Sequence, residues 1–158
     1  MKRMLGLWVV LAGCGGASAD ITGNIGGFSF DDVRSVYSGG PYVLLFDREF
    51  DCLDAGFNEG SYQEGSPLPG GEFVALQLHT GDEQFTPGSF TLAQNASVGA
   101  IGLINGEELQ VERGREGTIT FEEIDPGGQF VAGTIDIAFG EGSVSGSFRS
   151  EYCRNMVP

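Results

Sequence analysis

The sequence predicts an all-β domain, most specifically an antiparallel β-sandwich. Short segments of alternating apolar and polar residues follow one another along the chain, a pattern typical of strands with one buried face. Glycine-rich turns separate these segments, and glycine accounts for 27 of the 158 residues. The segments recur every 8 to 15 residues. We therefore expect 9 to 11 short strands and little or no helix, with a closed barrel as the alternative.

The first half of the chain contains several expected strands and one ambiguous segment. Residues 21–25 and 28–30 are expected to form the opening strand or hairpin. The apolar residues of 31–37 fit a helical turn and a strand equally well. Residues 42–46 are apolar on both faces, which indicates a central strand covered on both sides. A loop rich in glycine and proline then leads into a strand over residues 73–78.

The next pair of strands is predicted from a turn signal. Residues 98–104 and 107–111 flank the dipeptide Asn105-Gly106. Asn-Gly between two such segments is the strongest short-range signal for a hairpin with a two-residue turn. The sequence therefore places Asn105 in the turn, outside both strands.

The last strands are expected to form a three-stranded meander over residues 117–122, 129–139 and 143–149. Each segment alternates cleanly, which is typical of an antiparallel sheet with one face in solvent. The positions expected to face inward are Ile119, Phe121, Val131, Gly133, Ile135, Ile137, Phe139, Val144, Gly146 and Phe148.

The N-terminus has the layout of a secretory signal. Lys2 and Arg3 precede a short apolar run over residues 5–12, which is too short to span a bilayer as a helix. The run leads into Leu11-Ala12-Gly13-Cys14. This tetrapeptide resembles the lipobox of bacterial lipoproteins, in which an apolar residue and two small residues precede the modified cysteine. The resemblance implies a diacylglyceryl group on the Cys14 thiol and an acyl chain, such as palmitate, on its amine.

Two other interpretations of the N-terminus stay open. Ala17-Ser18-Ala19 is an A-x-A site, and cleavage after Ala19 would release a soluble secreted protein without Cys14. In the other interpretation, the protein is cytoplasmic and its first residues are apolar by coincidence.

The lipoprotein interpretation divides the chain into a signal peptide (1–13), a flexible tether (14–19) and one β-domain (20–158). Gly15 stands where aspartate would favour retention in the inner membrane, so the expected location is the outer membrane of a Gram-negative bacterium. The segments "GTIDIAF" and "VSGSFRSEYC" resemble the ending of small uncharacterised β-rich envelope lipoproteins, a likeness that implies no function.

Charge limits the expected partners. Removal of residues 1–13 leaves 22 acidic residues and six arginines, a formal charge of −16, and no lysine. Such a surface repels phosphate backbones and anionic head groups, so no nucleic-acid partner is expected. Attachment to a membrane would then depend on the N-terminal lipid.

The other two cysteines are expected to form a disulfide. With Cys14 lipidated, Cys52 and Cys153 remain together in an oxidising compartment. Two free thiols or a two-cysteine metal site are the alternatives, and a zinc site is disfavoured because the chain has one histidine and no C-x-x-C spacing.

The search for catalytic residues finds little. One histidine and no lysine in the mature chain leave few groups for general-base or Schiff-base catalysis. His79 follows the strand at 73–78 and is interpreted as a surface residue. No nucleophile elbow, phosphate-binding glycine loop or zinc-protease motif is present.

One weak metal candidate comes from the acidic segment after residue 46. Asp47, Glu49 and Asp51 have the alternate spacing of a calcium loop. However, Cys52 stands where the loop needs glycine, and Asn58 stands where it needs glutamate. No cofactor is expected.

These observations together predict a lipid-anchored envelope protein whose domain is a non-catalytic interaction or structural module. Its expected partners are the membrane, through the lipid, and an unidentified envelope protein or small ligand. The alternative is a calycin-like barrel holding a small apolar ligand, although the early G-x-W motif of lipocalins is absent because Trp8 lies in the signal peptide.

Overall fold

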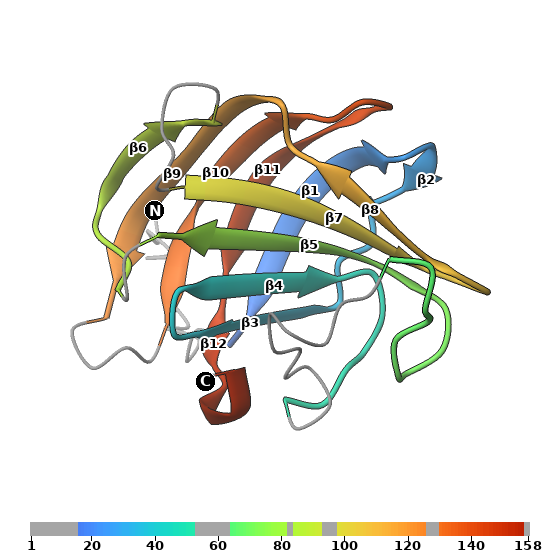
Figure 1. Cartoon of the computed structure of the whole chain (residues 1–158). Helices are drawn as coiled ribbons and strands as arrows, with labels where there is room; N and C mark the ends of the chain where they lie inside the picture. The colour runs from blue at the N-terminus through green and yellow to red at the C-terminus, as the bar shows by residue number, and fades with distance from the viewer. Residues whose placement is uncertain (1–15, 53–63, 82–83, 93–97, 126–129, 157–158) are drawn as a thin grey trace, which may run out of the picture.

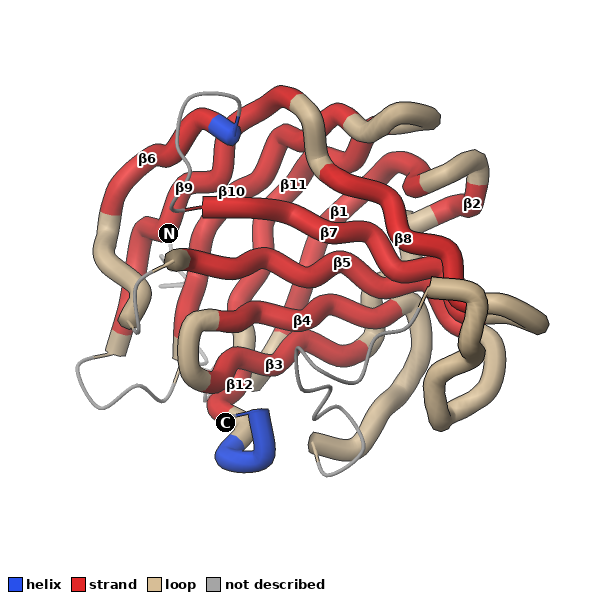
Figure 2. The backbone as a smooth tube through the Cα atoms, in the orientation of Figure 1, coloured by secondary structure: helices blue, strands red, loops and turns tan. Residues whose placement is uncertain are grey.

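The structure is a computed structural model that describes residues 16–52, 64–81, 84–92, 98–125 and 130–156. In this part of the chain, two six-stranded sheets lie face to face (Figures 1 and 2). The predicted β-sandwich is confirmed. The two sheets remain open, each with two edge strands, so the closed-barrel alternative is wrong.

The first sheet has the strand order β2-β1-β11-β10-β9-β6. Its strands are β1 (Ser18–Ile25), β2 (Phe28–Ser29), β6 (Gly88–Thr91), β9 (Glu116–Ile124), β10 (Val131–Ala138) and β11 (Ser143–Arg149). The predicted meander is its centre, because β10 pairs antiparallel with both β9 and β11. A register shift between Ala132 and Gly133 marks a bulge against β9.

The second sheet has the order β12-β3-β4-β5-β7-β8. Its strands are β3 (Ser35–Gly39), β4 (Tyr42–Phe46), β5 (Phe73–Thr80), β7 (Val98–Asn105), β8 (Leu109–Arg113) and β12 (Glu151–Tyr152), followed by the 3₁₀ turn η2 (Arg154–Met156). The short strand β12 runs parallel to β3, whereas the other pairs are antiparallel. The ambiguous segment 31–37 therefore enters a strand at Ser35, where pairing with β4 begins.

An inner core fills the space between the sheets. The inward positions of the meander are those that the alternation predicts, with Ile119, Phe121 and Ile137 almost wholly buried. Val43 and Leu45 of β4, together with Leu76 and Leu78 of β5, meet them from the second sheet.

A second apolar layer covers the other face of the second sheet. Leu44 and Phe46 point away from the inner core into this layer, here called the outer cluster, so β4 is covered on both sides as predicted. The outer cluster comprises Tyr37, Leu44, Phe46, Phe50, Leu68, Phe73, Ala75, Leu103, Leu109, Cys153 and Met156. Its cover comes from the long β4–β5 connection and from the C-terminus. Phe50 stacks on Phe46 with ring centroids 4.5 Å apart.

The predicted two-residue turn is wrong. Asn105 is the last residue of β7 and pairs with Leu109, so the connection is the three-residue loop Gly106-Glu107-Glu108. Neither Asn105 nor Gly106 has the positive φ that a type I′ turn requires. The reason lies in tertiary contacts, because the Asn105 side chain is buried and bonded to the β4–β5 connection.

The boundary of the tether also differs from the prediction. Ser18 and Ala19 belong to β1 and pair with Arg149 and Phe148, and Ala19 packs against the inner core. The domain therefore begins two residues before residue 20.

Candidate functional site

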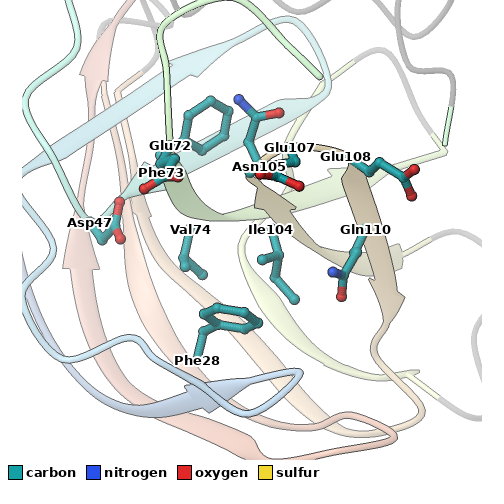
Figure 3. Close-up of a pocket in the computed structure, with 11 residues that line it drawn as sticks. Phe28, Asp47, Glu72, Phe73, Val74, Ile104, Asn105, Glu107, Glu108 and Gln110 are labelled. Atoms are coloured by element: carbon teal, nitrogen blue, oxygen red, sulfur yellow. The ribbon is translucent and has the colours of Figure 1, made fainter. Parts of the chain in front are cut away.

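A cleft opens at one end of the sandwich, between β2 of the first sheet and the ends of β5, β7 and β8 of the second (Figure 3). Its volume is about 630 Å³, within the range of small-molecule sites. This end cleft is lined by Phe28, Asp47, Glu72, Phe73, Val74, Ile104, Asn105, Gly106, Glu107, Glu108 and Gln110.

The floor of the end cleft is apolar. Val74 of β5 and Ile104 of β7 are partners in register and are buried at the margin of the inner core. Phe28 faces them from β2 and is 48% exposed. A half-exposed phenylalanine over a buried aliphatic pair offers a surface for an apolar group.

The walls of the end cleft are acidic. Four carboxylates line it, from Asp47, Glu72, Glu107 and Glu108, and no basic residue is among the lining residues. The nearby Arg48 is held by the β4–β5 connection, since its Nη1 donates to the carbonyl oxygens of Gly70 and Glu72 at 2.6 and 3.1 Å. The end cleft is therefore a negatively charged site with an apolar floor.

Asp47 is the most constrained of these carboxylates. Its backbone N–H donates to the carbonyl of Val74 at 3.0 Å, which fixes the residue beside the floor. Its Oδ1 is buried and has no hydrogen-bond partner among the described residues. Burial raises the pKa of Asp47 above its ordinary value, and the backbone of Val74 and Asp47 and the charge of Arg48 offset only part of that effect. Asp47 therefore brings a partly buried carboxylate to the wall of the cleft.

Asn105 holds the wall beside the floor. Its Oδ1 accepts from the Leu68 N–H at 2.7 Å, and its Nδ2 donates to the carbonyls of Leu68 and Gly71 at 3.0 and 2.7 Å. One buried amide thus fastens the β4–β5 connection to the end of β7.

The three calcium candidates are not brought together. Asp47 lines the end cleft, whereas Glu49 and Asp51 line a smaller hollow beside Arg48 and Phe50. The backbone leaves β4 at Phe46 and bends at Asp47 and Arg48, and the Phe50 side chain that follows is buried in the outer cluster. Within the described ranges, no three histidine, cysteine or acidic side chains are placed to hold a metal ion.

The predicted disulfide fits the structure. The Sγ atoms of Cys52 and Cys153 lie 2.10 Å apart, with Cα atoms 5.5 Å apart. Cys14 lies outside the described residues. The part of the chain that is described contains no helix long and apolar enough to cross a membrane.

His79, which the sequence predicts at the surface, is only partly exposed. It lies within β5, half-buried, opposite Gly99 of β7. A Cβ atom on Gly99 would fall 2.2 Å from the His79 ring, so the ring occupies the space that a side chain would need.

The sequence alone did not identify the end cleft. Its residues come from four separate stretches of the chain, and the pairing of strands together with the packing of the two sheets brings them together. The adjacent acids Glu107 and Glu108 in a hairpin loop were the one local signal. Comparison with protein-family models, curated proteins and solved structures gives no match to this chain.

Proposed function

We propose that this protein is an exported, lipid-anchored, non-catalytic binding module of the bacterial envelope, and that its end cleft holds a positively charged group with an apolar stem. The observation that carries the proposal is the meeting of four carboxylates and an apolar floor in one cleft whose lining has no basic residue. The partner that this chemistry fits is a protein segment in which lysine or arginine lies beside apolar residues.

The electrostatics favour this ligand over others. Anions are repelled by the four carboxylates and by the strongly acidic chain. An uncharged apolar ligand would cover the partly buried Asp47 carboxylate without supplying an opposite charge. A cation with an apolar stem pairs with Asp47 and covers Val74, Ile104 and Phe28.

A binding role without catalysis is supported by the position of the histidine. His79 lies six residues along β5 from Phe73, which borders the cleft. At about 3.3 Å per residue, the two positions are roughly 20 Å apart. The cleft thus offers carboxylates and amides, but no histidine to act as a general base.

Three probes with the same ring test the proposal: tryptamine, the uncharged tryptophol and the anionic indole-3-propionate. In equilibrium dialysis with the full-length protein in detergent, tryptamine is expected to bind at least roughly tenfold more tightly than tryptophol, since one partly buried charge pair contributes about 1.4 kcal/mol or more. Indole-3-propionate is expected not to bind. Equal binding of the three probes, or binding of none, would overturn the proposal.

The variant Asp47→Asn is expected to lose tryptamine affinity and gain stability. Because burial raises the pKa of Asp47, the neutral acid is favoured in the folded state, and this stabilising contribution is lost as pH rises through the raised pKa. Asp47→Asn removes that loss, so its advantage in unfolding free energy over the wild type should grow with pH. Urea unfolding at a series of pH values measures this advantage.

The exposed Asp51 provides the matched control. Asp51→Asn has the same charge change and should alter neither tryptamine binding nor the pH dependence. Partition of the probe into detergent is the same for all three proteins. If Asp47→Asn bound tryptamine as the wild type does, Asp47 would have no role in the site.

The lipid anchor is the second part of the proposal, and the start of β1 supports it. Cleavage after Ala19 would remove Ser18 and Ala19, which pair with β11. Cleavage before Cys14 keeps β1 whole and leaves only residues 15–17 between the lipid and the domain.

We expect the wild-type protein to fractionate with membranes and its intact mass to include the diacylglyceryl and acyl groups. Cys14→Ser should remove the lipid mass and the membrane association. A mature N-terminus at Asp20 without lipid would instead show a soluble secreted protein.

A further inference from the structure

The solvent face of the first sheet carries two ordered rows of short polar side chains, independent of the end cleft. The pairing registers place Ser89, Thr120, Thr134, Ser147 and Asp20 in one row across β6, β9, β10, β11 and β1. The same registers place Thr91, Thr118, Asp136, Ser145 and Thr22 in the next row. We call these ten residues the hydroxyl face.

The composition of the hydroxyl face is unusual for this acidic chain. It has eight hydroxyl groups and two carboxylates, and no long, basic or apolar side chain interrupts the rows. All ten residues are exposed or partly exposed. The arginine in the adjoining register position, Arg149, is bonded to Glu123 at 3.2 Å and lies 3.7 Å over the Phe130 ring.

A shallow hollow of about 510 Å³ lies at the centre of this face. Six residues of the hydroxyl face line it: Asp20, Thr118, Thr120, Thr134, Asp136 and Ser147. Gly146 contributes backbone to the hollow. Its φ is 147°, and a Cβ atom at this position would fall 2.0 Å from the Asp20 carbonyl oxygen, so no side chain fits there. Ile135 also borders the hollow, but its side chain is buried in the inner core, so the exposed side chains around the hollow are short and polar.

We propose that the hydroxyl face binds an uncharged polysaccharide. Hydroxyl groups both donate and accept hydrogen bonds, and carboxylates accept from neighbouring hydroxyls, so the rows match the chemistry of sugar hydroxyls. The rows carry the negative charges of Asp20 and Asp136 and contain no basic residue. This charge disfavours phosphates and acidic glycans as ligands. The lack of apolar side chains disfavours lipids and apolar peptide segments.

The geometry fits a chain of sugars and not a single one. Neighbouring strands lie about 4.8 Å apart, and alternate residues on one strand are about 6.7 Å apart. This spacing is comparable to the width of a sugar ring, and the rows cross five strands. Each contact is exposed and weak, so useful affinity needs several adjacent sugars.

Affinity electrophoresis tests the proposal. The full-length protein in detergent is run through native gels cast with dextran, laminarin or galactomannan, and with the anionic polysaccharide alginate. At least one neutral polysaccharide is expected to retard the protein, and alginate is expected not to. Retardation by none of the neutral polysaccharides, or equal retardation by alginate, would overturn the proposal.

Two variants locate the site. Thr120→Val with Thr134→Val removes two hydroxyls while keeping β-branched side chains, and affinity should fall roughly tenfold or more. Thr118→Arg places a long side chain over the hollow from an exposed position and should abolish retardation. Because this position is exposed, the variant tests the site even if the double variant does not fold.

Thr86→Val is the matched control, because Thr86 is exposed and lies outside the rows. It should behave as the wild type, and so should Asp47→Asn, which alters only the end cleft. Unchanged retardation in both site variants would place polysaccharide binding elsewhere and exclude the hydroxyl face.

Discussion

Replacing both bridging cysteines, in the variant Cys52→Ala with Cys153→Ala, is expected to lower the free energy of unfolding by about 3–5 kcal/mol. The bridge spans a sequence separation of 101 residues, so its loss releases a long loop in the unfolded chain. It also frees the two segments that cover the outer cluster. Phe50 lies two residues from Cys52, and Met156 lies three residues from Cys153.

Urea unfolding with and without a reducing agent measures this effect, and reduction of the wild type should reproduce the double variant. Cys14→Ser is the matched control, because Cys14 is the third cysteine and is proposed to carry the lipid anchor. It should leave the unfolding midpoint unchanged. A loss below about 1 kcal/mol in the double variant would mean that strand pairing alone holds the outer cluster closed.

Asn105→Ala is expected to cost about 2–4 kcal/mol. The side chain is 3% exposed and makes three hydrogen bonds to the backbone of Leu68 and Gly71. Truncation leaves a buried Leu68 N–H without its acceptor, and an unsatisfied buried group costs about 1–3 kcal/mol before the lost packing is added.

The exposed Gln110 lines the same cleft and gives the control. Gln110→Ala should change the unfolding free energy by less than about 0.5 kcal/mol. Asn105→Asp should be at least as destabilising as Asn105→Ala, because a carboxylate cannot donate to the two carbonyls. If Asn105→Ala unfolded at the wild-type urea concentration, the β4–β5 connection would be held by other contacts.

The structure separates two surfaces that a single sandwich can use independently. The end cleft lies between the two sheets at one end of the sandwich, and the hydroxyl face lies on the solvent side of the first sheet. One has the chemistry for a cation with an apolar stem and the other for uncharged sugars. The two proposals together give this domain one surface for a protein segment and another for a polysaccharide.

Much of the fold could be predicted because strand alternation is a local property. The alternation of apolar and polar residues over 117–149 predicts which side chains face inward, and burial in the structure follows that pattern. The alternation also predicted that the threonines and serines of these strands face outward. Their arrangement into rows could not be predicted, because a row depends on the register between strands as far apart in the sequence as β1 and β11.

Asn105 shows where local reasoning fails. Its dipeptide favours a tight turn, but three hydrogen bonds to residues 34 and 37 positions away hold it at the end of β7. The gain from those buried bonds outweighs the preference of a two-residue sequence. A different non-local contact, from the Asp47 N–H to the Val74 carbonyl, holds Asp47 beside the end cleft, whereas Glu49 and Asp51 lie elsewhere.

Sequence alone was enough to predict most of the strands, the inward faces of the meander, the pairing of Cys52 with Cys153 and an anchor at Cys14, whereas β6 and β12 were not expected. Those features depend on local periodicity, residue chemistry and short motifs. The three-dimensional structure was needed to show that the sheets stay open, that a second apolar layer covers one of them, and that Phe28, Asp47 and Ile104 share a cleft. Sheet order, register and the packing of one sheet on the other join distant segments, and none of these is encoded in the pattern of any one strand.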